Sequence, residues 1–175
     1  MVEPPAHKSV LVPVANGCEE LETVAIIDIL RRAGCDVLSA KVSQQHVNST
    51  VHWQSDKNDP DPFCQVALSR GLKMKTDVPL EDITDKNFDL IALPGGFLGA
   101  QILAHNPHLI NLLKKHMKSN RLTGAICASP VLVLCNRGLL LDYHDEHHYT
   151  CHPAVYTEID PCHYDAEKYS KGERK

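Results

Sequence analysis

Short apolar runs alternate along the chain with longer segments that carry helix signals. The runs have the length of buried strands and occupy residues 9–14, 36–42, 88–93 and 123–126. The helix signals fall on residues 18–34, 106–120 and 129–138. Alternation of strands with helices predicts an α/β fold, in which a mostly parallel sheet has right-handed crossovers and helices on both faces.

The first predicted helix, residues 18–34, has matching signals at both ends. Glutamates crowd its first turn, two arginines occupy its last turn, and Gly34 supplies the stop, in agreement with the helix dipole and with C-cap preferences. Its apolar residues cover more than one stripe. We therefore expect one side to pack on the sheet and the other on a further surface, for which a second subunit is one candidate.

Three other stretches complete the predicted organisation. Asn106 is a suitable N-cap for the second helix, with Pro107 at its first position. Apolar residues alternate on both sides of Arg70 and Gly71, which predicts a small hairpin over residues 66–74. The polar stretch 43–65 is interpreted as an insert that is either functional or loosely ordered. Without internal repeats, residues 1–175 are predicted to form one domain.

The composition narrows the class of protein. The chain has 175 residues, a net charge of -4 at pH 7 and an isoelectric point near 6.2, which are values of an ordinary soluble enzyme or binding domain. Nothing in it indicates a specific nucleic-acid partner. The amino terminus does not resemble a secretory signal, and no run reaches the ~18 apolar residues of a membrane span. We expect a cytoplasmic protein without a membrane partner.

Seven cysteines stand at irregular spacing, and their odd number disfavours a disulfide framework. One of them, Cys127, stands where a predicted strand gives way to a predicted helix. Ligands of parallel sheets bind beyond the carboxyl ends of the strands, where the loops ANGCEE, PGGFLG and CASP meet. N–H groups at a helix start favour a thiolate and stabilise an oxyanion. A small buried cysteine without chemistry is the competing interpretation.

The segments AICASP, LPGGFLGAQ and NGCEELETVAIIDILRRAG, taken together, resemble three motifs of the ThiJ/PfpI superfamily, specifically its DJ-one branch. They match the nucleophile elbow, the oxyanion loop and the first strand–helix unit. The likeness runs in order from about Ser9 to His152, interrupted by the polar insert. The resemblance implies a flavodoxin-like three-layer sandwich, a homodimer and no cofactor.

The resemblance also implies roles for single residues. Cys127 matches the nucleophilic, oxidation-sensitive cysteine, and Glu22 matches a carboxyl group that hydrogen-bonds its sulfur. Gly96 and Ala128 match backbone N–H donors around the pocket, and His152 matches a histidine beside the thiol. Because a glutamate and a thiolate this close titrate as a pair, we expect a protonated carboxyl that donates to sulfur.

Two arginines and one serine are further candidates for substrate binding. Arg70 resembles an arginine that reaches a neighbouring active site across the dimer, and Arg32 is a weaker match. Ser129 stands where the family's elbow usually has glycine. Its hydroxyl would crowd a substrate, cap the helix, or bond an oxygen on Cys127. Ala128 stands where the protease-like branch has histidine, which argues against peptidase activity.

The carboxyl-terminal part departs from the family. The family continues with a strand, a glycine-rich loop and a packing helix, so we expect the domain to be incomplete here, through cleavage, as a separate fragment, or because the chain is a piece. Residues 144–163 concentrate histidines and cysteines. The pairs Cys151–His152 and Cys162–His163 match no standard zinc spacing, so no metal is expected.

The function that the resemblance implies is a cysteine-dependent, cofactor-independent glyoxalase or deglycase acting on glyoxal, methylglyoxal and their adducts. Thiolate attack on the aldehyde would give a hemithioacetal, and Glu22 would move a proton between adjacent carbons before hydrolysis. The alternative is a redox sensor or chaperone-like oxidative-stress protein without significant turnover, since a low-pKa thiolate oxidises readily.

Overall fold

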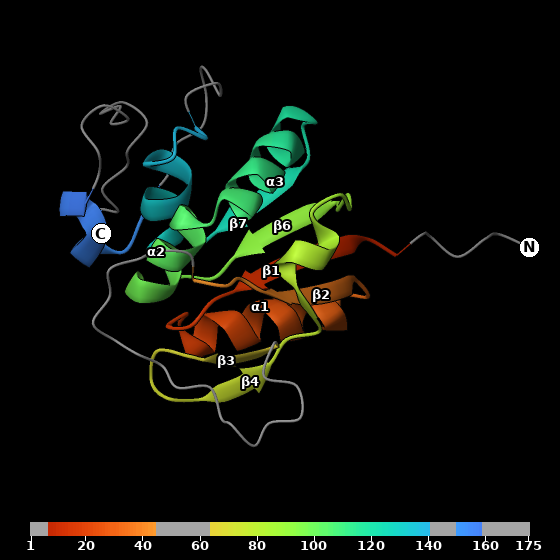
Figure 1. The fold of residues 1–175 in the computed structure, drawn as a ribbon, viewed down its shortest axis with the longest axis horizontal. Helices are drawn as coiled ribbons and strands as arrows, with labels where there is room; N and C mark the ends of the chain where they lie inside the picture. Colours follow the sequence, from red (N-terminus) through yellow and green to blue (C-terminus); the bar gives the residue numbers. More distant parts are fainter. Residues whose placement is uncertain (1–6, 45–63, 141–149, 159–175) are drawn as a thin grey trace, which may run out of the picture.

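Parallel strands form the central sheet of the computed structural model, which describes residues 7–44, 64–140 and 150–158 (Figure 1). The strands are β1 (Ser9–Val14), β2 (Asp36–Lys41), β5 (Val78–Pro79), β6 (Leu90–Leu93) and β7 (Leu122–Ala125). Their spatial order is β5-β2-β1-β6-β7, and every pairing in this five-stranded sheet is parallel. The predicted α/β fold with a parallel sheet is confirmed.

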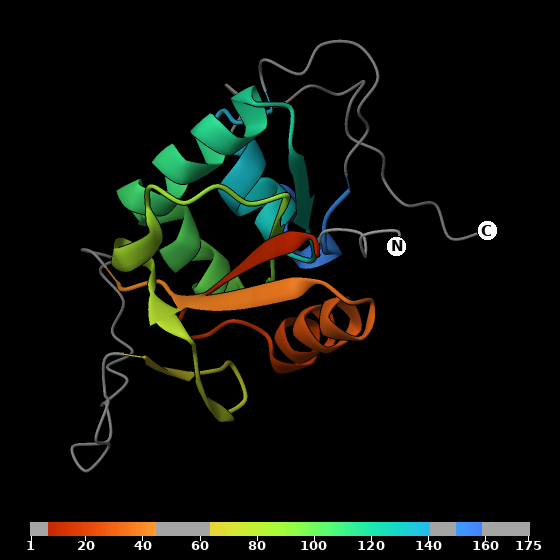
Figure 2. The ribbon, with the colours of Figure 1, turned by 90° about the vertical axis from the view of Figure 1, so that its right-hand side faces the viewer.

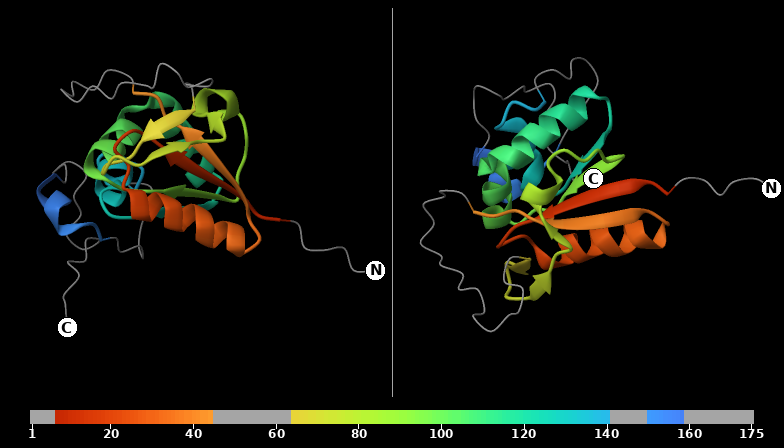
Figure 3. Two further views of the ribbon diagram at one scale, coloured as in Figure 1. Left: turned by 90° about the horizontal axis from the view of Figure 1, so that it is seen from below. Right: turned by 45° about the vertical axis from the view of Figure 1, so that its right-hand side comes forward.

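The helices lie in two layers, one on each side of the sheet. Helix α1 (Glu20–Arg32) lies against β1 and β2, whereas α2 (Phe97–His105) and α3 (Pro107–Lys118) lie on the opposite face (Figure 2). The right-hand view of Figure 3 shows the same separation, with the strands between α1 and α3. The three-layer arrangement is therefore present in the described part of the chain.

Helix α1 begins and ends where the sequence signals place it. The Glu19 side chain accepts a hydrogen bond from the Glu22 N–H at 2.8 Å and so caps the amino end. Gly34 follows the last turn with a φ of +83°, a conformation that costs glycine little. The charges at the two ends complement the helix dipole, as predicted.

Helix α3 confirms the capping prediction as well. The Asn106 side chain accepts a hydrogen bond from the Leu109 N–H at 3.0 Å, and Pro107 occupies the first helical position. The apolar side of this helix is buried, which fixes α3 against the sheet.

Two segments differ from the sequence prediction. Helix α2 was not predicted, because its residues are apolar almost all round and follow Gly96 directly, so that the stretch has no polar stripe to mark it as a helix. The predicted helix 129–138 is instead a short π-helix, η2 (Pro130–Cys135), whose residues are all buried. The helix dipole behind Cys127 is correspondingly short.

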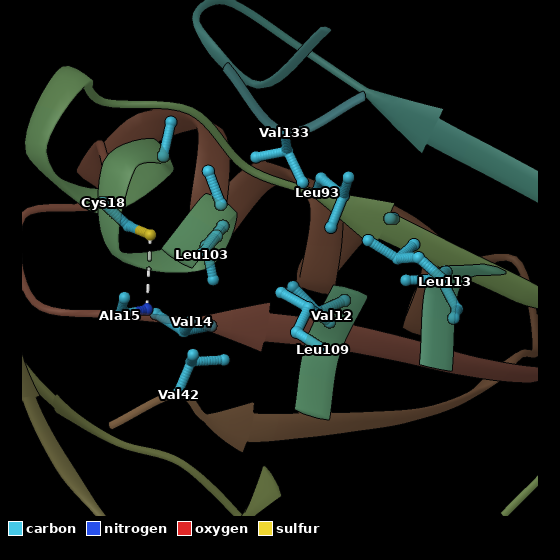
Figure 4. Packing of buried hydrophobic residues seen from close by; sticks show 14 of the residues in the cluster. Val12, Val14, Ala15, Cys18, Val42, Leu93, Leu103, Leu109, Leu113 and Val133 are labelled. Carbon is cyan, nitrogen blue, oxygen red and sulfur yellow. Dashed lines mark hydrogen bonds between the residues drawn. The ribbon is translucent and has the colours of Figure 1, made fainter. Parts of the chain in front are cut away.

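The main core lies between the sheet and the layer of α2, α3 and η2 (Figure 4). Leu93, Leu103 and Leu113 are fully buried there. Cys18 is part of the same cluster, and its sulfur accepts a hydrogen bond from the Ala15 N–H at 3.3 Å. Burial raises the pKa of the Cys18 thiol to about 12, so Cys18 is an inert packing residue.

The predicted hairpin is present as β3 (Gln65–Ala67) and β4 (Lys73–Lys75), an antiparallel pair that turns at Gly71. Short 3-10 helices follow at η1 (Leu80–Ile83) and η3 (Pro153–Glu158). Most of the predicted insert 43–65 and most of the histidine-rich stretch 144–163 lie outside the described residues. No helix within the described ranges is long and apolar enough to cross a membrane.

Candidate functional site

Three loops meet at the carboxyl ends of β1, β6 and β7, as the parallel topology predicts. The loop after β1 approaches the loop after β6 through a hydrogen bond from the Glu19 N–H to the Gly95 carbonyl at 3.1 Å. The turn after β7 joins the same loop through the Ser129 hydroxyl, which donates to the Pro94 carbonyl at 2.6 Å. The contacts bring segments far apart in sequence into one small region.

Cys127 occupies the turn between β7 and η2 in a strained conformation. Its φ is +61°, in the left-handed region that non-glycine residues rarely adopt. Such a conformation costs about 1–2 kcal/mol and persists where the surrounding structure fixes it. The residue is partly exposed, whereas Cys135 in η2 is buried. Cys127 therefore has the backbone geometry of a nucleophile elbow.

The Cys127 sulfur has three polar neighbours. The backbone N–H groups of Gly96 and Ala128 hydrogen-bond it, and so does the side chain of Glu22. All four of these residues were candidates from the sequence, and the structure brings them together. The Glu22 carboxyl is fixed from its other side by the Gly95 N–H, which donates to its Oε2 at 2.7 Å.

The pKa of the Cys127 thiol lies above its ordinary value, whereas the sequence had led us to expect a low one. Burial raises this pKa most, and the Glu22 carboxyl raises it further through its hydrogen bond and its charge. The N–H groups of Gly96 and Ala128 lower it without reversing the direction. Burial and the Glu22 carboxyl together therefore favour the thiol form over the thiolate.

Two consecutive glycines let the loop after β6 approach the sulfur. A Cβ at Gly95 would lie 2.6 Å from the Cys127 Cβ and 2.7 Å from Glu22 Oε2, closer than real Cβ contacts. Gly96 has a φ of +85°, and a Cβ there would lie 2.5 Å from the Gly17 carbonyl oxygen. No side chain fits at either position, because Gly95 lies against Cys127 and Glu22 and Gly96 lies against the loop after β1.

Glu20 has a role that sequence reasoning missed. The sequence indicated only that the glutamates of the first turn, Glu20 among them, suit the helix dipole. The Glu20 carboxylate also accepts hydrogen bonds from the Ser69 hydroxyl at 2.7 Å and from the Arg70 N–H. Although desolvation opposes them, these bonds lower the pKa of Glu20. Glu20 therefore ties the turn of the β3–β4 hairpin to the first turn of α1.

His152 reaches Cys127 through its backbone. Its N–H donates to the Cys127 carbonyl at 2.8 Å. Its ring is exposed, and Nδ1 accepts the Ala154 N–H at 3.2 Å, so the neutral ring carries its proton on Nε2. The structure thus places the His152 backbone beside Cys127, and the hydrogen bond of its ring goes to Ala154.

The two candidate arginines do not reach the site within one chain. The exposed Arg70 lies in the hairpin turn, and its expected role across a dimer involves a second chain. Arg32 bonds Asp28 at 2.9 Å at the far end of α1, roughly 15 Å along the axis from Glu22 at 1.5 Å per residue. The structure therefore does not support a role for Arg32 in the Cys127 site of its own chain.

Ser129 is fully buried, and its hydroxyl is engaged by the Pro94 carbonyl. Of the roles expected for it, capping is wrong, since its side chain makes no capping hydrogen bond to η2. Its bond to the loop before Gly95 was not predicted. Its only signal in the sequence was a hydroxyl two residues after Cys127, before an apolar run.

Two other observations concern possible ligand sites. Within the described ranges, no group of three or more histidine, cysteine or acidic residues is arranged to hold a metal ion. An open hollow of about 600 Å³ lies at the amino ends of β1, β6 and β7, lined in part by Lys8, Asp89 and Arg121. Because parallel sheets bind their ligands at the carboxyl ends, this hollow lies at the wrong edge for chemistry at Cys127.

Comparison with known proteins shows which family this chain resembles. A model of the DJ-1/PfpI family matches residues 8–172. Protein DJ-1 homolog B of Arabidopsis thaliana is 41% identical over 131 residues, which are 75% of this chain and 26% of that protein. The Caenorhabditis elegans protein named glutathione-independent glyoxalase DJR-1.2 is 33% identical over 151 residues, or 86% of this chain and 67% of that protein.

Solved structures carry the same fold. Oxidized DJ-1 of Toxoplasma gondii has a TM-score of 0.74 and 33% identity, covering 94% of this chain and 75% of its own. Drosophila melanogaster DJ-1beta has a TM-score of 0.73 and 27% identity, covering 97% and 75%. The chain spans only 26% and 29% of the two Arabidopsis relatives. On the family match over residues 8–172 and these structures, the chain belongs to the DJ-1/PfpI family.

Proposed function

We propose that the chain is a cofactor-independent glyoxalase or deglycase that acts on glyoxal, methylglyoxal or their adducts, with Cys127 as nucleophile. The observation that carries the proposal is the arrangement of the Glu22 carboxyl and the Gly96 and Ala128 N–H groups around the Cys127 sulfur. Support comes from the relative named a glutathione-independent glyoxalase, a name that describes that protein.

Proton transfer between Cys127 and Glu22 opens the reaction. Because burial raises the pKa of the thiol, the sulfur needs a base, and the Glu22 carboxyl already hydrogen-bonds it. The sulfur then forms a bond to the aldehyde carbon, while the N–H groups of Gly96 and Ala128 stabilise the negative oxygen. Protonation of that oxygen gives the hemithioacetal.

The hemithioacetal of methylglyoxal becomes a thioester by an internal proton shift. Glu22 removes the proton from the carbon bonded to sulfur and returns a proton to the adjacent carbon, so one carbon is oxidised as the other is reduced. Water then cleaves the thioester, which releases lactate and restores the thiol. The net reaction adds one water to methylglyoxal and needs no external oxidant or reductant. The proposal also gives the exposed His152 ring, with its proton on Nε2, a supporting role in proton transfer.

The outer side of α1 favours the proposed homodimer. Leu21, Val24 and Ile29 are 76%, 47% and 63% exposed in the single chain. An apolar set of this kind on one helix is typical of a surface that a partner covers. The same pairing would give Arg70, in the exposed hairpin turn, a neighbouring site to approach.

The test compares variants for methylglyoxal consumption without glutathione. Cys127→Ser is expected to reduce the rate to that of the buffer, and Glu22→Gln to lower it by roughly 100-fold or more. Cys35→Ser is the matched control, because Cys35 is a partly exposed free cysteine just beyond the other end of α1. If Cys127→Ser consumes methylglyoxal as fast as the wild type, the assignment of the nucleophile is wrong.

A redox sensor is the second candidate function. Cys127 is partly exposed, and the N–H groups of Gly96 and Ala128 that bond its sulfur are suited to hold the oxygens of a sulfinate. Treatment with dilute peroxide followed by peptide mass spectrometry separates the two candidates. Selective oxidation of Cys127 in a protein that does not consume methylglyoxal would favour the sensor.

A further inference from the structure

One peptide group beside the nucleophile is hydrogen-bonded at both ends. The carbonyl of Pro94 accepts the Ser129 hydroxyl at 2.6 Å, and the N–H of Gly95, in the same peptide group, donates to Glu22 Oε2 at 2.7 Å. Ser129 is fully buried, so water does not compete for its hydroxyl. The serine of the elbow and the glutamate of α1 are thus linked through a single amide plane.

We infer that Ser129 is a positioning residue that acts on Glu22 through the Pro94–Gly95 peptide group. A hydroxyl that donates to the carbonyl polarises the amide, which makes the N–H of the same group a better donor to the carboxyl. The link also fixes the rotation of the carboxyl group.

The packing around Gly95 explains why the peptide group stays in one orientation. A flip would break both hydrogen bonds at once and bury an unpaired carbonyl and an unpaired N–H, which is costly. The space beside Gly95 is filled, since even a Cβ there would lie 2.6 Å from the Cys127 Cβ. Removing the Ser129 hydroxyl leaves the Pro94 carbonyl without this donor and loosens the hold on Glu22.

Other roles for Ser129 fit the structure less well. It does not cap η2, and the bond of its buried hydroxyl to the Pro94 carbonyl removes it from the chemistry as a nucleophile. A purely structural role would make Ser129 independent of Glu22. The inference instead requires that the two residues be coupled, and a double-mutant cycle measures that coupling directly.

The experiment follows alkylation of Cys127 by iodoacetamide as a function of pH, with the modified peptide quantified by mass spectrometry. The cycle contains the wild type, Ser129→Ala, Glu22→Gln and the double variant. In the wild-type background we expect Glu22→Gln to change the alkylation rate near neutral pH by at least about threefold. In the Ser129→Ala background we expect the logarithm of the rate change caused by Glu22→Gln to be less than half of its value in the wild-type background.

Two controls separate positioning from general stability. Ser129→Thr keeps a hydroxyl and is expected to restore the wild-type coupling. Thr76→Val removes another buried hydroxyl-to-carbonyl bond, that of Thr76 to Cys64 at 3.0 Å, and should leave the coupling unchanged. Thermal unfolding of each variant shows that the alkylation data come from folded protein. Equal effects of Glu22→Gln in both Ser129 backgrounds would overturn the inference.

The turnover arm of the test rests on the proposed function. Ser129→Ala should lower kcat for methylglyoxal about tenfold with KM changed by less than about twofold, because the residue orients a proton-transfer group and does not bind substrate. If the wild type has no such activity, the proposed function fails, while the alkylation cycle still decides the role of Ser129.

Discussion

Replacement of Gly95 by alanine is the sharpest steric perturbation of the site. The added Cβ would lie 2.6 Å from the Cys127 Cβ, 2.7 Å from Glu22 Oε2 and 2.9 Å from the Ile126 carbonyl oxygen. Since unstrained carbon atoms approach to about 3.5–4.0 Å, the neighbours must move apart by roughly 1 Å. Two of the three contacts involve the proposed nucleophile, Cys127, and its proposed base, Glu22, so the displacement falls on the proposed chemistry.

The expected losses of stability and of rate follow from the typical costs of such displacements in proteins. Overpacking of this kind costs about 1–3 kcal/mol, which for a chain of this length lowers Tm by roughly 2–12 °C. A misplacement of about 1 Å between reacting groups costs roughly 100-fold in rate. We therefore expect Gly95→Ala to fold and to lose about two orders of magnitude in kcat/KM.

Gly124→Ala is the matched control, since Gly124 lies in β7, three residues before Cys127, and has nothing within 4 Å of an added Cβ. It should retain stability to within about 0.5 kcal/mol and keep full activity. Calorimetry gives Tm, and alkylation of Cys127 gives a readout that does not depend on the substrate. Wild-type alkylation and turnover in Gly95→Ala would refute the steric reasoning.

Three further predictions concern pH. Burial and, after it, the Glu22 carboxyl raise the pKa of the Cys127 thiol, so Glu22→Gln should lower the pH midpoint of alkylation. An unchanged or higher midpoint would contradict the contact. Burial lowers the pKa of His116 below 6.5 in the folded chain, so the stability that its neutral form contributes is present above pH 6.5 and is lost as the pH falls. His116→Gln should therefore weaken the pH dependence of the free energy of unfolding in this range, as measured by urea denaturation. Hydrogen bonds from the backbone and side chain of Ser9 and from Lys8 lower the pKa of Asp89 from 3.8 to about 2. The stability that these bonds contribute is present above pH 3.8 and should fall as the pH drops toward 2. Asp89→Asn should remove this pH dependence of the free energy of unfolding.

Local capping rules and the topology of parallel sheets account for most of what the sequence predicted correctly. Gly34 and Asn106 were predicted to mark helix ends, and their signals are readable within a few residues, whereas the capping role of Glu19 was not predicted. The meeting of Glu22 with Cys127 follows from the rule that parallel strands present their carboxyl ends at one edge. The positions of Gly96 and Ala128 beside the sulfur came from family resemblance and agree with the geometry, and their roles toward a substrate stay predictions.

The parts that sequence reasoning missed depend on tertiary distances. Helix α2 is apolar almost all round, so periodicity carried no information about it. The bond from Ser129 to Pro94 joins residues 35 positions apart, and no local pattern marks it. The direction of the Cys127 pKa was wrong because burial and the Glu22 charge outweigh the N–H donors, and desolvation is a property of the folded chain alone.

The left-handed backbone conformation of Cys127 lowers the stability of the fold at the position that carries the proposed chemistry. A φ of +61° is unstrained for glycine and strained for any residue with a side chain. On backbone energy alone, glycine would therefore be more stable than cysteine at position 127. Selection for thermostability without selection for activity should therefore recover Cys127→Gly among its stabilised clones, and those clones should have lost the thiol chemistry. At position 127, selection for stability and selection for thiol chemistry would therefore favour different residues.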